Sequence, residues 1–435
     1  MKVSLISLGC PKNQVAAEQM LAALSAAGHE ITSDPAEAEA VVVNTCAFIE
    51  DAKQEAIDTL LEAAELKNGR LKTLLCAGCL AQLYGGEVMS ELPEVDGVVG
   101  VGSCERIAEA LEAAARGERP VYLDPNDAPV QESARLVCTG PAWAYLLIAE
   151  GCDNRCSYCL IPSIRGPFRS RPVSAILEEA RSLAAQGYKE IILVAQDLTH
   201  YGADFKDGTC LAALLRELCA VEGLEWLRLH YLYPHELDDG LIEVIASEPK
   251  IVKYLDIPIQ HINDDILRKM NRRDRGADIR ALLKKLRERI PGLVLRTSLI
   301  TGLPGEGEAE FEELCEFLRE AKIERAGVFP FSPEEGTPAA KMPHVDADTA
   351  RQRAELVNAL QAEIMDEWER SLAGSVIEAM CDEYDPETGT ARGRAYFDSP
   401  GVDGSVVFPG PCMPGSIVQL RVLSAEDGEL SCEPI

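Results

Sequence analysis

The chain has 435 residues, of which 47% are hydrophobic and 26% are charged, as in an ordinary globular protein. That length exceeds what one hydrophobic core normally holds, so we expect about two to four domains. The formal net charge of −30 disfavours nucleic acid and favours a basic partner, although solubility alone is an alternative explanation of this charge. No apolar run reaches the roughly 18 residues of a membrane span, and we expect a cytoplasmic protein without a membrane partner.

The first segment, residues 1–117, alternates apolar runs with amphipathic stretches. The expected strands are residues 2–8, 40–44, 72–77 and 95–101, and the expected helices are 15–27, 53–67 and one that begins at Cys104. This alternation favours an α/β domain with a parallel sheet, whose functional groups lie on loops after the carboxyl ends of the strands. Three cysteines each follow one of the apolar runs, and we call them the amino-terminal trio: Cys10, Cys46 and Cys79.

Residues 118–137 are rich in proline and acidic side chains, and we expect a linker there. A second α/β pattern follows in residues 138–370 and predicts a partial β/α barrel with its chemistry at the carboxyl ends of the strands. The expected strands are residues 144–149, 190–195, 224–230, 254–258, 294–300 and 326–331, before a closing helix at 349–372.

The tail, residues 371–435, consists of short apolar stretches punctuated by glycine and proline. This pattern predicts a small antiparallel β-barrel. Three arginines and eleven acidic residues leave the tail with a formal charge of −8. Such a surface releases few counterions and should bind RNA poorly.

The cysteines point to metal rather than to disulfides, because fifteen are scattered through a large chain without a signal-peptide pattern. Three of them form a CxxxCxxC pattern directly after an expected strand, and we call them the loop trio: Cys152, Cys156 and Cys159. Four-iron clusters normally take four thiolates, so a group of three indicates an iron left open to an exchangeable ligand. Structural zinc, which more often uses paired CxxC knuckles, is the alternative.

The loop trio, with Tyr158 before its last cysteine, resembles the signature of radical S-adenosylmethionine (SAM) enzymes. The resemblance implies that the trio holds a 4Fe-4S cluster whose open iron chelates the amino and carboxylate groups of SAM. Electron transfer into the sulfonium then releases methionine and a 5′-deoxyadenosyl radical, and an electron donor is required.

The same resemblance implies where SAM is contacted. Tyr158 is expected at the adenine, and Gln196 and Asp197 follow the second barrel strand, where this family commonly holds the methionyl amine. Glu306 ends the segment TGLPGE (301–306), which is expected on the other side of the cofactor. No separate acid or base catalyst is implied.

The segments SLGCPKN, VVNTCAF and AGCLAQ, which contain the amino-terminal trio, resemble the first domain of the methylthiotransferases. In that family three cysteines hold a second 4Fe-4S cluster, so two clusters and SAM are expected. Cys76 lies close to Cys79, but the motif matches at Cys79. After CPKN the chain has Gln14, Ala16 and Ala17 where the family more often has other residues, which places in doubt any role of polar groups there.

Motifs from end to end, among which IPSIRGPFRSR discriminates best, resemble the RimO type of methylthiotransferase. That type adds a methylthio group to the β-carbon of an aspartate of small-subunit ribosomal protein twelve. The resemblance implies that the radical abstracts hydrogen from this carbon and that the second cluster supplies sulfur methylated from another SAM. The tail resembles a TRAM domain, usually an RNA-binding module, but its charge favours a basic ribosomal protein, free or on the ribosome.

Two other functions compete with this interpretation. The first is a tRNA-adenosine methylthiotransferase, and the second is a non-catalytic iron–sulfur or zinc protein. Arg165, Arg169 and Arg171 follow the loop trio and are candidates to neutralise a carboxylate of the substrate or of SAM. The strand-end histidines are expected to form hydrogen bonds rather than bind metal: His200, His230, His235 and His261.

Overall fold

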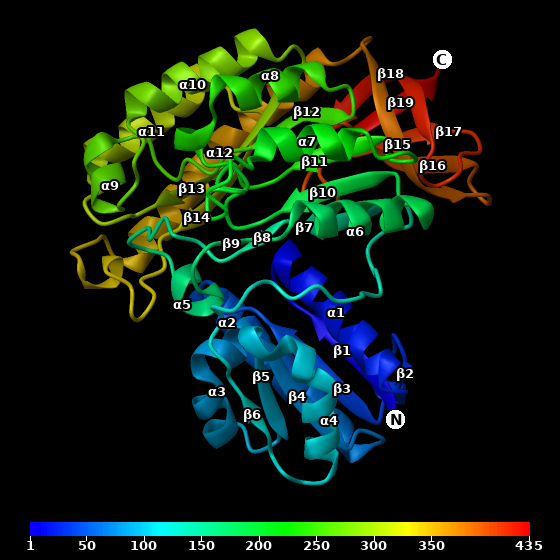
Figure 1. Cartoon of the computed structure of the whole chain (residues 1–435). Helices are drawn as coiled ribbons and strands as arrows, with labels where there is room; N and C mark the ends of the chain where they lie inside the picture. Colours follow the sequence, from blue (N-terminus) through cyan, green and yellow to red (C-terminus); the bar gives the residue numbers. More distant parts are fainter. The chain divides into compact units, whose positions relative to one another are not determined.

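The computed structural model describes all 435 residues, and their contacts group the chain into two compact units (Figure 1). Unit 1 comprises Met1–Cys138, Ala149–Arg171 and Ser332–Ala340. Unit 2 comprises Thr139–Ile148, Pro172–Phe331 and Lys341–Ile435. The loop trio therefore belongs to the same unit as the amino-terminal trio. The division into residues 1–117, 118–137, 138–370 and 371–435 that the sequence predicts stays a prediction. The contacts instead place parts of the predicted barrel domain in unit 1 and the tail in unit 2.

Unit 1 contains a six-stranded, entirely parallel sheet in the order β2-β1-β3-β4-β5-β6. The strands are β1 (Lys2–Ser7), β2 (Glu30–Ile31), β3 (Ala40–Thr45), β4 (Thr73–Gly78), β5 (Gly97–Gly100) and β6 (Val121–Tyr122). The helices are α1 (Pro11–Ala26), α2 (Glu50–Glu65), α3 (Cys79–Glu91), α4 (Ile107–Ala115) and α5 (Ile161–Arg165), with short 3-10 turns η1 (Pro35–Glu37), η2 (Leu66–Asn68) and η3 (Val101–Arg106). A separate antiparallel pair, β8 (Ala149–Glu150) and β9 (Arg169–Ser170), flanks the segment of the loop trio.

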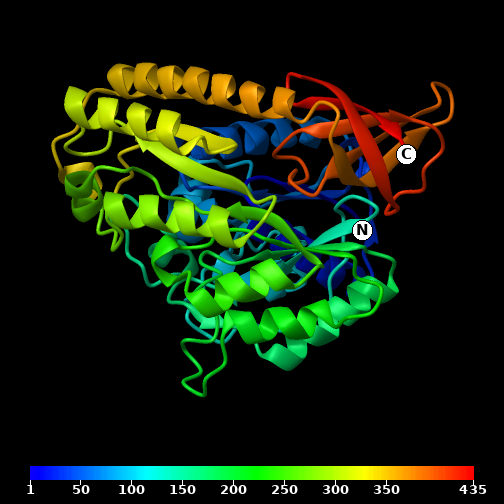
Figure 2. The same cartoon turned by 90° about the horizontal axis from the view of Figure 1, so that it is seen from above.

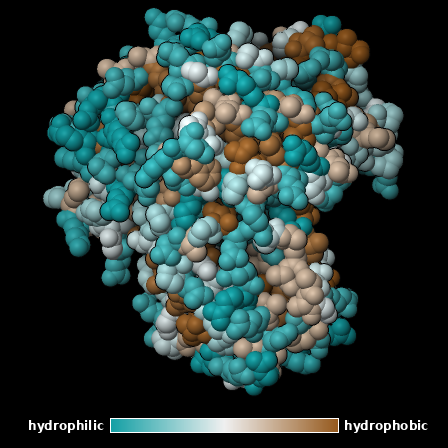
Figure 3. All heavy atoms as spheres, in the orientation of Figure 1, coloured by the Kyte–Doolittle hydropathy of each residue, from teal (hydrophilic) through white to brown (hydrophobic).

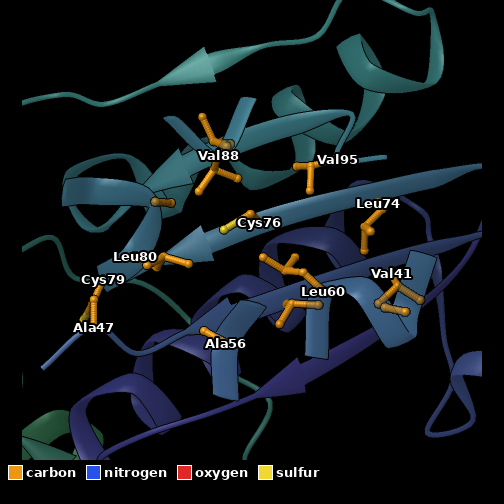
Figure 4. Close-up of a cluster of buried hydrophobic side chains, with 14 of the residues drawn as sticks. Val41, Ala47, Ala56, Leu60, Leu74, Cys76, Cys79, Leu80, Val88 and Val95 are labelled. Carbon is orange, nitrogen blue, oxygen red and sulfur yellow. The ribbon is translucent and has the colours of Figure 1, made fainter. Parts of the chain in front are cut away.

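Both faces of the unit 1 sheet are buried, which explains the nearly continuous apolar runs of its strands. Val41 and Leu74 face α2 and α3, whereas Val42 and Leu75 face α1 and α4. Figure 4 shows the first of these clusters. Leu160 and Ile164, from the segment after the loop trio, are buried in the same cluster and anchor that segment in the core of unit 1.

The strand order reverses between β1 and β3, which are hydrogen-bonded neighbours although α1 and β2 separate them in the chain. Ligand sites of open parallel sheets form outside the carboxyl ends of the strands at such a reversal. Cys10 and Cys46 lie there, shortly after β1 and β3, and Cys79 follows the next strand, β4.

Unit 2 contains a second parallel sheet, in the order β14-β13-β12-β11-β10-β7. Its two edge strands do not pair with each other, so the sheet is the expected open, partial barrel. The strands are β7 (Trp143–Leu147), β10 (Glu190–Val194), β11 (Trp226–Leu229), β12 (Ile251–Asp256), β13 (Val294–Thr301) and β14 (Arg325–Pro330). The helices are α6 (Val173–Ala185), α7 (Leu211–Cys219), α8 (Asp239–Ser247), α9 (Asp264–Lys269), α10 (Gly276–Arg289), α11 (Glu308–Ala321) and α12 (Ala347–Ser371), with the 3-10 turn η4 (Pro234–Glu236). A further 3-10 turn, η5 (Ala339–Lys341), spans the point where the chain passes from unit 1 to unit 2.

The tail forms a closed five-stranded barrel in the order β15-β16-β17-β19-β18. The strands are β15 (Val376–Asp385), β16 (Thr390–Ala395), β17 (Ser405–Pro409), β18 (Ile417–Glu426) and β19 (Glu429–Pro434). Four of its strand pairs are antiparallel, as expected for a small antiparallel barrel, and one pair, β17 with β19, is parallel. The reason is geometric, because a closed ring with an odd number of strands cannot alternate in direction throughout. Figure 2 shows α12, which packs against β13, β14 and β18.

Buried ion pairs join this small barrel to the unit 2 sheet. Glu190 at the start of β10 bonds Arg228 at 2.7 Å and Arg394 at 2.5 Å. Arg325 at the start of β14 bonds Asp398 at 2.8 Å.

Further bonds of the unit 2 sheet join Tyr254 to Asp403 at 2.6 Å, His230 to Ser399 at 3.0 Å and Arg325 to Glu369 at 2.8 Å. Removing one partner of such a buried pair typically costs about 3–5 kcal/mol, so these contacts hold the two parts of unit 2 together.

The outer surface is mainly hydrophilic on the face that Figure 3 shows. Hydrophilic residues cover most of the face drawn in Figure 3, and hydrophobic residues form separate patches on it. No helix combines the length and the apolar character that crossing a membrane would require.

Candidate metal centres

The structure brings the amino-terminal trio together at the carboxyl edge of the unit 1 sheet. Cys10 is the residue before α1, Cys46 follows β3, and Cys79 is the first residue of α3. Each thiol is close enough to the other two for electrostatic interaction. None of the fifteen cysteines of the chain forms a disulfide bond.

The electrostatic setting differs among these three thiols. Burial opposes ionisation of Cys10, but Lys12, Arg165 and backbone N–H groups at the start of α1 outweigh it and lower the pKa of this thiol. Burial raises the pKa of Cys46 to about 11 and also raises that of Cys79, although Arg165 acts in the opposite direction on Cys79. Binding of a metal as thiolate would have to overcome these shifts at Cys46 and Cys79.

Two glycines let the backbone reach this arrangement. Gly9 has φ +89°, and a Cβ there would lie 2.8 Å from the Cβ of Cys46. Gly78 has φ +90°, and a Cβ there would lie 2.5 Å from Oδ1 of Asn44. Both positions combine left-handed backbone with a close approach, so only glycine fits without strain.

Cys76, the competitor of Cys79 in sequence, lies elsewhere. Its side chain is fully buried among the apolar residues between the sheet and the helices α2 and α3, whereas Cys79 lies beyond the end of β4 (Figure 4). Burial raises the pKa of Cys76 to about 12. The geometry groups Cys79, and not Cys76, with Cys10 and Cys46.

The loop trio is carried by a tightly folded segment of unit 1. Gly151 has φ +77°, and a Cβ there would lie 1.9 Å from the carbonyl oxygen of Pro167. The N–H of Cys152 donates to Gly166 O at 3.2 Å, and the N–H of Cys159 donates to Cys156 O at 3.0 Å. The N–H of Ile161 donates to Sγ of Cys159 at 3.4 Å. All three thiols are partly exposed, as a cluster with an exchangeable ligand needs.

Arg165, at the end of α5, links the segment of the loop trio to the amino-terminal trio. Its guanidinium is 3% exposed and donates to Glu150 Oε1 at 2.9 Å, to Asn13 Oδ1 at 2.5 Å and to Sγ of Cys79 at 3.7 Å. Glu150 and the nearby thiols raise the pKa of Arg165 although burial alone would lower it. The arginine is thus held by unit 1 itself and has protein partners in place of the carboxylate of a substrate or of SAM.

The other two candidate arginines are also engaged within unit 1. Arg169 donates to the carbonyl oxygen of Asn126 at 2.8 Å, and Arg171 donates to Glu132 Oε1 at 3.0 Å. They fasten the segment 118–137, which the sequence identifies as a linker, to the segment of the loop trio.

The predicted SAM contacts fall in both units. Tyr158 lies in the loop of unit 1, and Gln196 and Glu306 follow β10 and β13 of unit 2. Both Oε1 and Nε2 of Gln196 are buried without a hydrogen-bond partner, which fits a ligand that offers a donor and an acceptor. Glu306 accepts from the N–H of Gly302 and from Arg353, each at 2.8 Å, so it has strong partners of its own. The roles of all three toward SAM stay predictions.

Three of the four strand-end histidines, His200, His230 and His261, form hydrogen bonds as expected, and for His235 the expectation stays a prediction. Nδ1 of His200 lies 3.1 Å from Glu236 Oε1, Nε2 of His230 lies 3.0 Å from the Ser399 hydroxyl, and Nδ1 of His261 accepts from the N–H of Asn263 at 3.0 Å.

Sequence reasoning missed Asn13 and Glu150. Asn13 is 1% exposed, and its amide donates to Leu8 O at 3.0 Å and to Thr45 O at 2.9 Å, which joins the loops of Cys10 and Cys46. The position of Asn13 inside CPKN and that of Glu150 two residues before Cys152 were the available signals. Neither signal reveals that both residues bond Arg165, which lies 152 residues from Asn13 and 15 residues from Glu150.

The donors of both trios suit iron–sulfur clusters. No three side chains gather closely enough to bind a single metal ion. Cysteine thiolates are the ligands that iron–sulfur clusters take, so the chemistry of the donors, three thiols in each trio, fits such a cluster. Lys12 and Arg165 next to the amino-terminal trio supply positive charge that offsets the thiolates.

Three family models match the chain, each over one segment. They are described as the uncharacterized protein family UPF0004 over residues 2–100, the Radical SAM superfamily over residues 146–318 and the TRAM domain over residues 373–435. The second match includes the loop trio, and this superfamily implies a 4Fe-4S cluster and SAM as cofactors. The third covers the closed five-stranded barrel.

Solved structures share the fold. TsrM, a radical S-adenosylmethionine methyltransferase from Kitasatospora setae, has a TM-score of 0.55 at 17% identity, covering 78% of this chain and 73% of that chain. OxsB, a cobalamin-dependent S-adenosylmethionine radical enzyme, has a TM-score of 0.53 at 13% identity, covering 84% of this chain and 56% of that chain.

Relatives named ribosomal protein uS12 methylthiotransferase RimO match from end to end. The one from Geobacter sulfurreducens is 48% identical over 440 residues, which cover 100% of this chain and 98% of the relative. The one from Pelobacter propionicus is 47% identical over 435 residues, which cover 99% and 97%. The chain therefore belongs to the RimO family of radical SAM methylthiotransferases.

Proposed function

We propose that this protein transfers a methylthio group to the β-carbon of an aspartate of ribosomal protein uS12 and that each cysteine trio holds a 4Fe-4S cluster. The observation that carries the proposal is the convergence of Cys10, Cys46 and Cys79 from three strand ends in the unit that also contains the loop trio. The full-length similarity to relatives named for this reaction supports it.

The two clusters and SAM, when bound, supply radical and sulfur chemistry, which no side chain can provide at an unactivated carbon–hydrogen bond. The chain's own residues position these groups. Cys10, Cys46 and Cys79 follow the ends of three strands of one sheet, and the backbone bonds around Gly151 and Gly166 shape the loop that carries the other three thiols. Gln196 is proposed to bind the methionyl part of SAM through its unpartnered amide.

The substrate is proposed to be recognised by charge. The small barrel of residues 371–435 carries −8, and a basic ribosomal protein would be drawn to it by long-range attraction. Such steering weakens as salt screens the charges. An electron donor is required, and the proposed location is the cytoplasm, where ribosomes and reduced thiols occur.

The first test compares the wild type with Cys46→Ala and Cys152→Ala after anaerobic reconstitution. Iron and sulfide should fall from two clusters to one in each variant. With reductant and SAM, Cys46→Ala should still form 5′-deoxyadenosine but no methylthio product, whereas Cys152→Ala should form neither. Equal iron in Cys46→Ala and wild type would exclude the amino-terminal cluster.

The substrate is tested by mass spectrometry of uS12 and of tRNA from a deletion strain with and without the gene. Modification of uS12 that depends on the gene is expected, with tRNA unchanged. The tRNA alternative predicts the reverse, but no observation of this chain favours it over the ribosomal substrate named for its relatives.

A further inference from the structure

The side chain of Arg165 joins its own segment to Asn13, which lies 152 residues away in sequence. One arm of its guanidinium bonds Glu150, two residues before the loop trio, and the other arm bonds Asn13 and Sγ of Cys79. All of these residues belong to unit 1, and the arginine is almost completely buried.

Only one of the two arms of the Arg165 guanidinium meets a carboxylate. The interaction with Glu150 is a buried ion pair, whereas the arm toward the amino-terminal trio meets an amide oxygen and a sulfur. Oε2 of Glu150 is buried and has no hydrogen-bond partner. A buried environment screens charge weakly, so a change at either residue is felt strongly at Cys79.

We propose that Arg165 is a positioning residue that tunes the cluster of the amino-terminal trio, and that Glu150 sets the strength of this effect. The inference rests on the proposed function, because it requires a cluster on Cys10, Cys46 and Cys79. A cation and an N–H donor next to a ligand sulfur stabilise the reduced, more negative state of an iron–sulfur cluster and raise its reduction potential. Glu150 partly cancels this cation and lowers the potential.

The same contact explains why arginine is required. A guanidinium offers a planar fork of five donors and can serve Glu150 on one side and both Asn13 and Cys79 on the other. Lysine would keep the charge but could not hold all three groups in this geometry. The residue thereby also fixes α5, and with it the segment of the loop trio, against the edge of the sheet that holds the first three cysteines.

The test uses the full-length chain with Cys152, Cys156 and Cys159 all replaced by alanine, so that only one cluster remains. In this parent we would compare Arg165→Gln, Arg165→Lys and Glu150→Gln. Iron and sulfide content shows whether the cluster is retained, and a redox titration followed by electron paramagnetic resonance gives its midpoint potential. Arg171→Gln, which removes a paired arginine of the same segment whose partner is Glu132, is the matched control.

Shifts of opposite sign are expected. Arg165→Gln should move the midpoint potential to a more negative value, Glu150→Gln should move it to a more positive value, and Arg171→Gln should leave it unchanged. Arg165→Lys should lie between the parent and Arg165→Gln. A purely structural role would give shifts of the same sign, or loss of iron without a shift, and either result would overturn the proposal.

Two safeguards keep the result interpretable. If Arg165→Gln fails to retain iron, the nearly isosteric Glu150→Gln still decides the question, because an unchanged or more negative potential in it contradicts the proposal. If the parent itself holds no cluster, the proposed function and this inference fail together. Unchanged potentials in a parent that holds its cluster defeat only the role of Arg165.

Discussion

One group of buried charges in each unit has a different set of partners, although each unit is built on an open, six-stranded parallel sheet. In unit 2, Glu190 and Arg325 meet opposite charges, and their bonds join the sheet to the small barrel. In unit 1, Arg165 meets one carboxylate and then a cysteine sulfur and an amide. The comparison shows that the burial of an arginine does not by itself indicate its role. An arginine that contacts only opposite charges stabilises the fold, whereas one that contacts a ligand sulfur can act on the site.

The two trios in unit 1 differ as well. The loop trio depends on the local path of one short loop, whereas the amino-terminal trio depends on the register of three strands. Variants at these positions test the differences between the two units and between the two trios, and the change expected in the free energy of unfolding decreases from the first variant to the last.

The path of the loop is tested by Gly151→Ala. A Cβ at this position would lie 1.9 Å from a backbone carbonyl oxygen and would force a side chain into left-handed backbone. We expect a loss of about 4 kcal/mol or more in the free energy of unfolding of the apo protein, and loss of iron from the loop trio. Urea unfolding and iron analysis measure these effects.

Gly86→Ala is the matched control for that variant. This glycine lies in α3 with no atom within 4 Å of an added Cβ, so alanine should stabilise the protein by about 0.5–1 kcal/mol. Equal stability of the two variants would show that the loop adjusts its path and is not held as described.

Glu190→Gln tests whether the buried charges of unit 2 stabilise the fold. The buried Arg228 would lose its anionic partner, and Arg394 would keep only Asp382, so we expect a cost of about 3–5 kcal/mol in the free energy of unfolding. Asp366→Asn, at a partly exposed pair with Arg370, should cost less than about 0.5 kcal/mol. A small effect of Glu190→Gln would mean that the contact does not hold the barrel to the sheet.

A pH dependence follows from Asp398 in the same interface. Burial raises the pKa of its carboxyl from 3.8 to about 6, against the opposing effect of Arg325 and with a further contribution from Asp403. The folded state then binds the proton more tightly, so the stability from this group is present below about pH 4 and is lost as the pH rises past 6. The loss amounts to at most about 3 kcal/mol.

Asp398→Asn should remove this part of the pH dependence. The measurement is the difference in the free energy of unfolding between wild type and variant, followed from pH 5 to pH 7 by urea titration. The wild type should lose stability relative to the variant over this range. A constant difference would contradict the assigned shift.

Apart from the control variants, the smallest change in stability is expected for Cys76→Ala, in the core beside the amino-terminal trio. Loss of one buried sulfur should cost about 1 kcal/mol and leave the iron content unchanged. Cys79→Ala should instead remove the iron of this trio. The reverse outcome for iron would make Cys76 the ligand and would contradict the geometry at the end of β4.

The fold was largely predictable because hydrophobic periodicity reports burial directly. The apolar runs at residues 40–44 and 190–195 correspond to β3 and β10 with ends shifted by at most one residue, since each lies in a sheet covered on both faces. The antiparallel tail was recognised from its glycines and prolines. Its single parallel pair, β17 with β19, depends on how the ring closes, which no local pattern contains.

The sequence by itself determined which thiols matter, because the spacing within the loop trio and the place of each other cysteine after an apolar run are local features. Only the tertiary structure decided what lies next to them. From the sequence, Arg165 is a candidate for binding a carboxylate of substrate or SAM, but in the folded chain it is a buried partner of Cys79. Glu306 likewise accepts hydrogen bonds from Gly302 and Arg353, which the sequence does not reveal. The physical reason is that hydrophobic burial is encoded residue by residue, whereas the partner of a buried charge is selected by chain segments that only folding brings together.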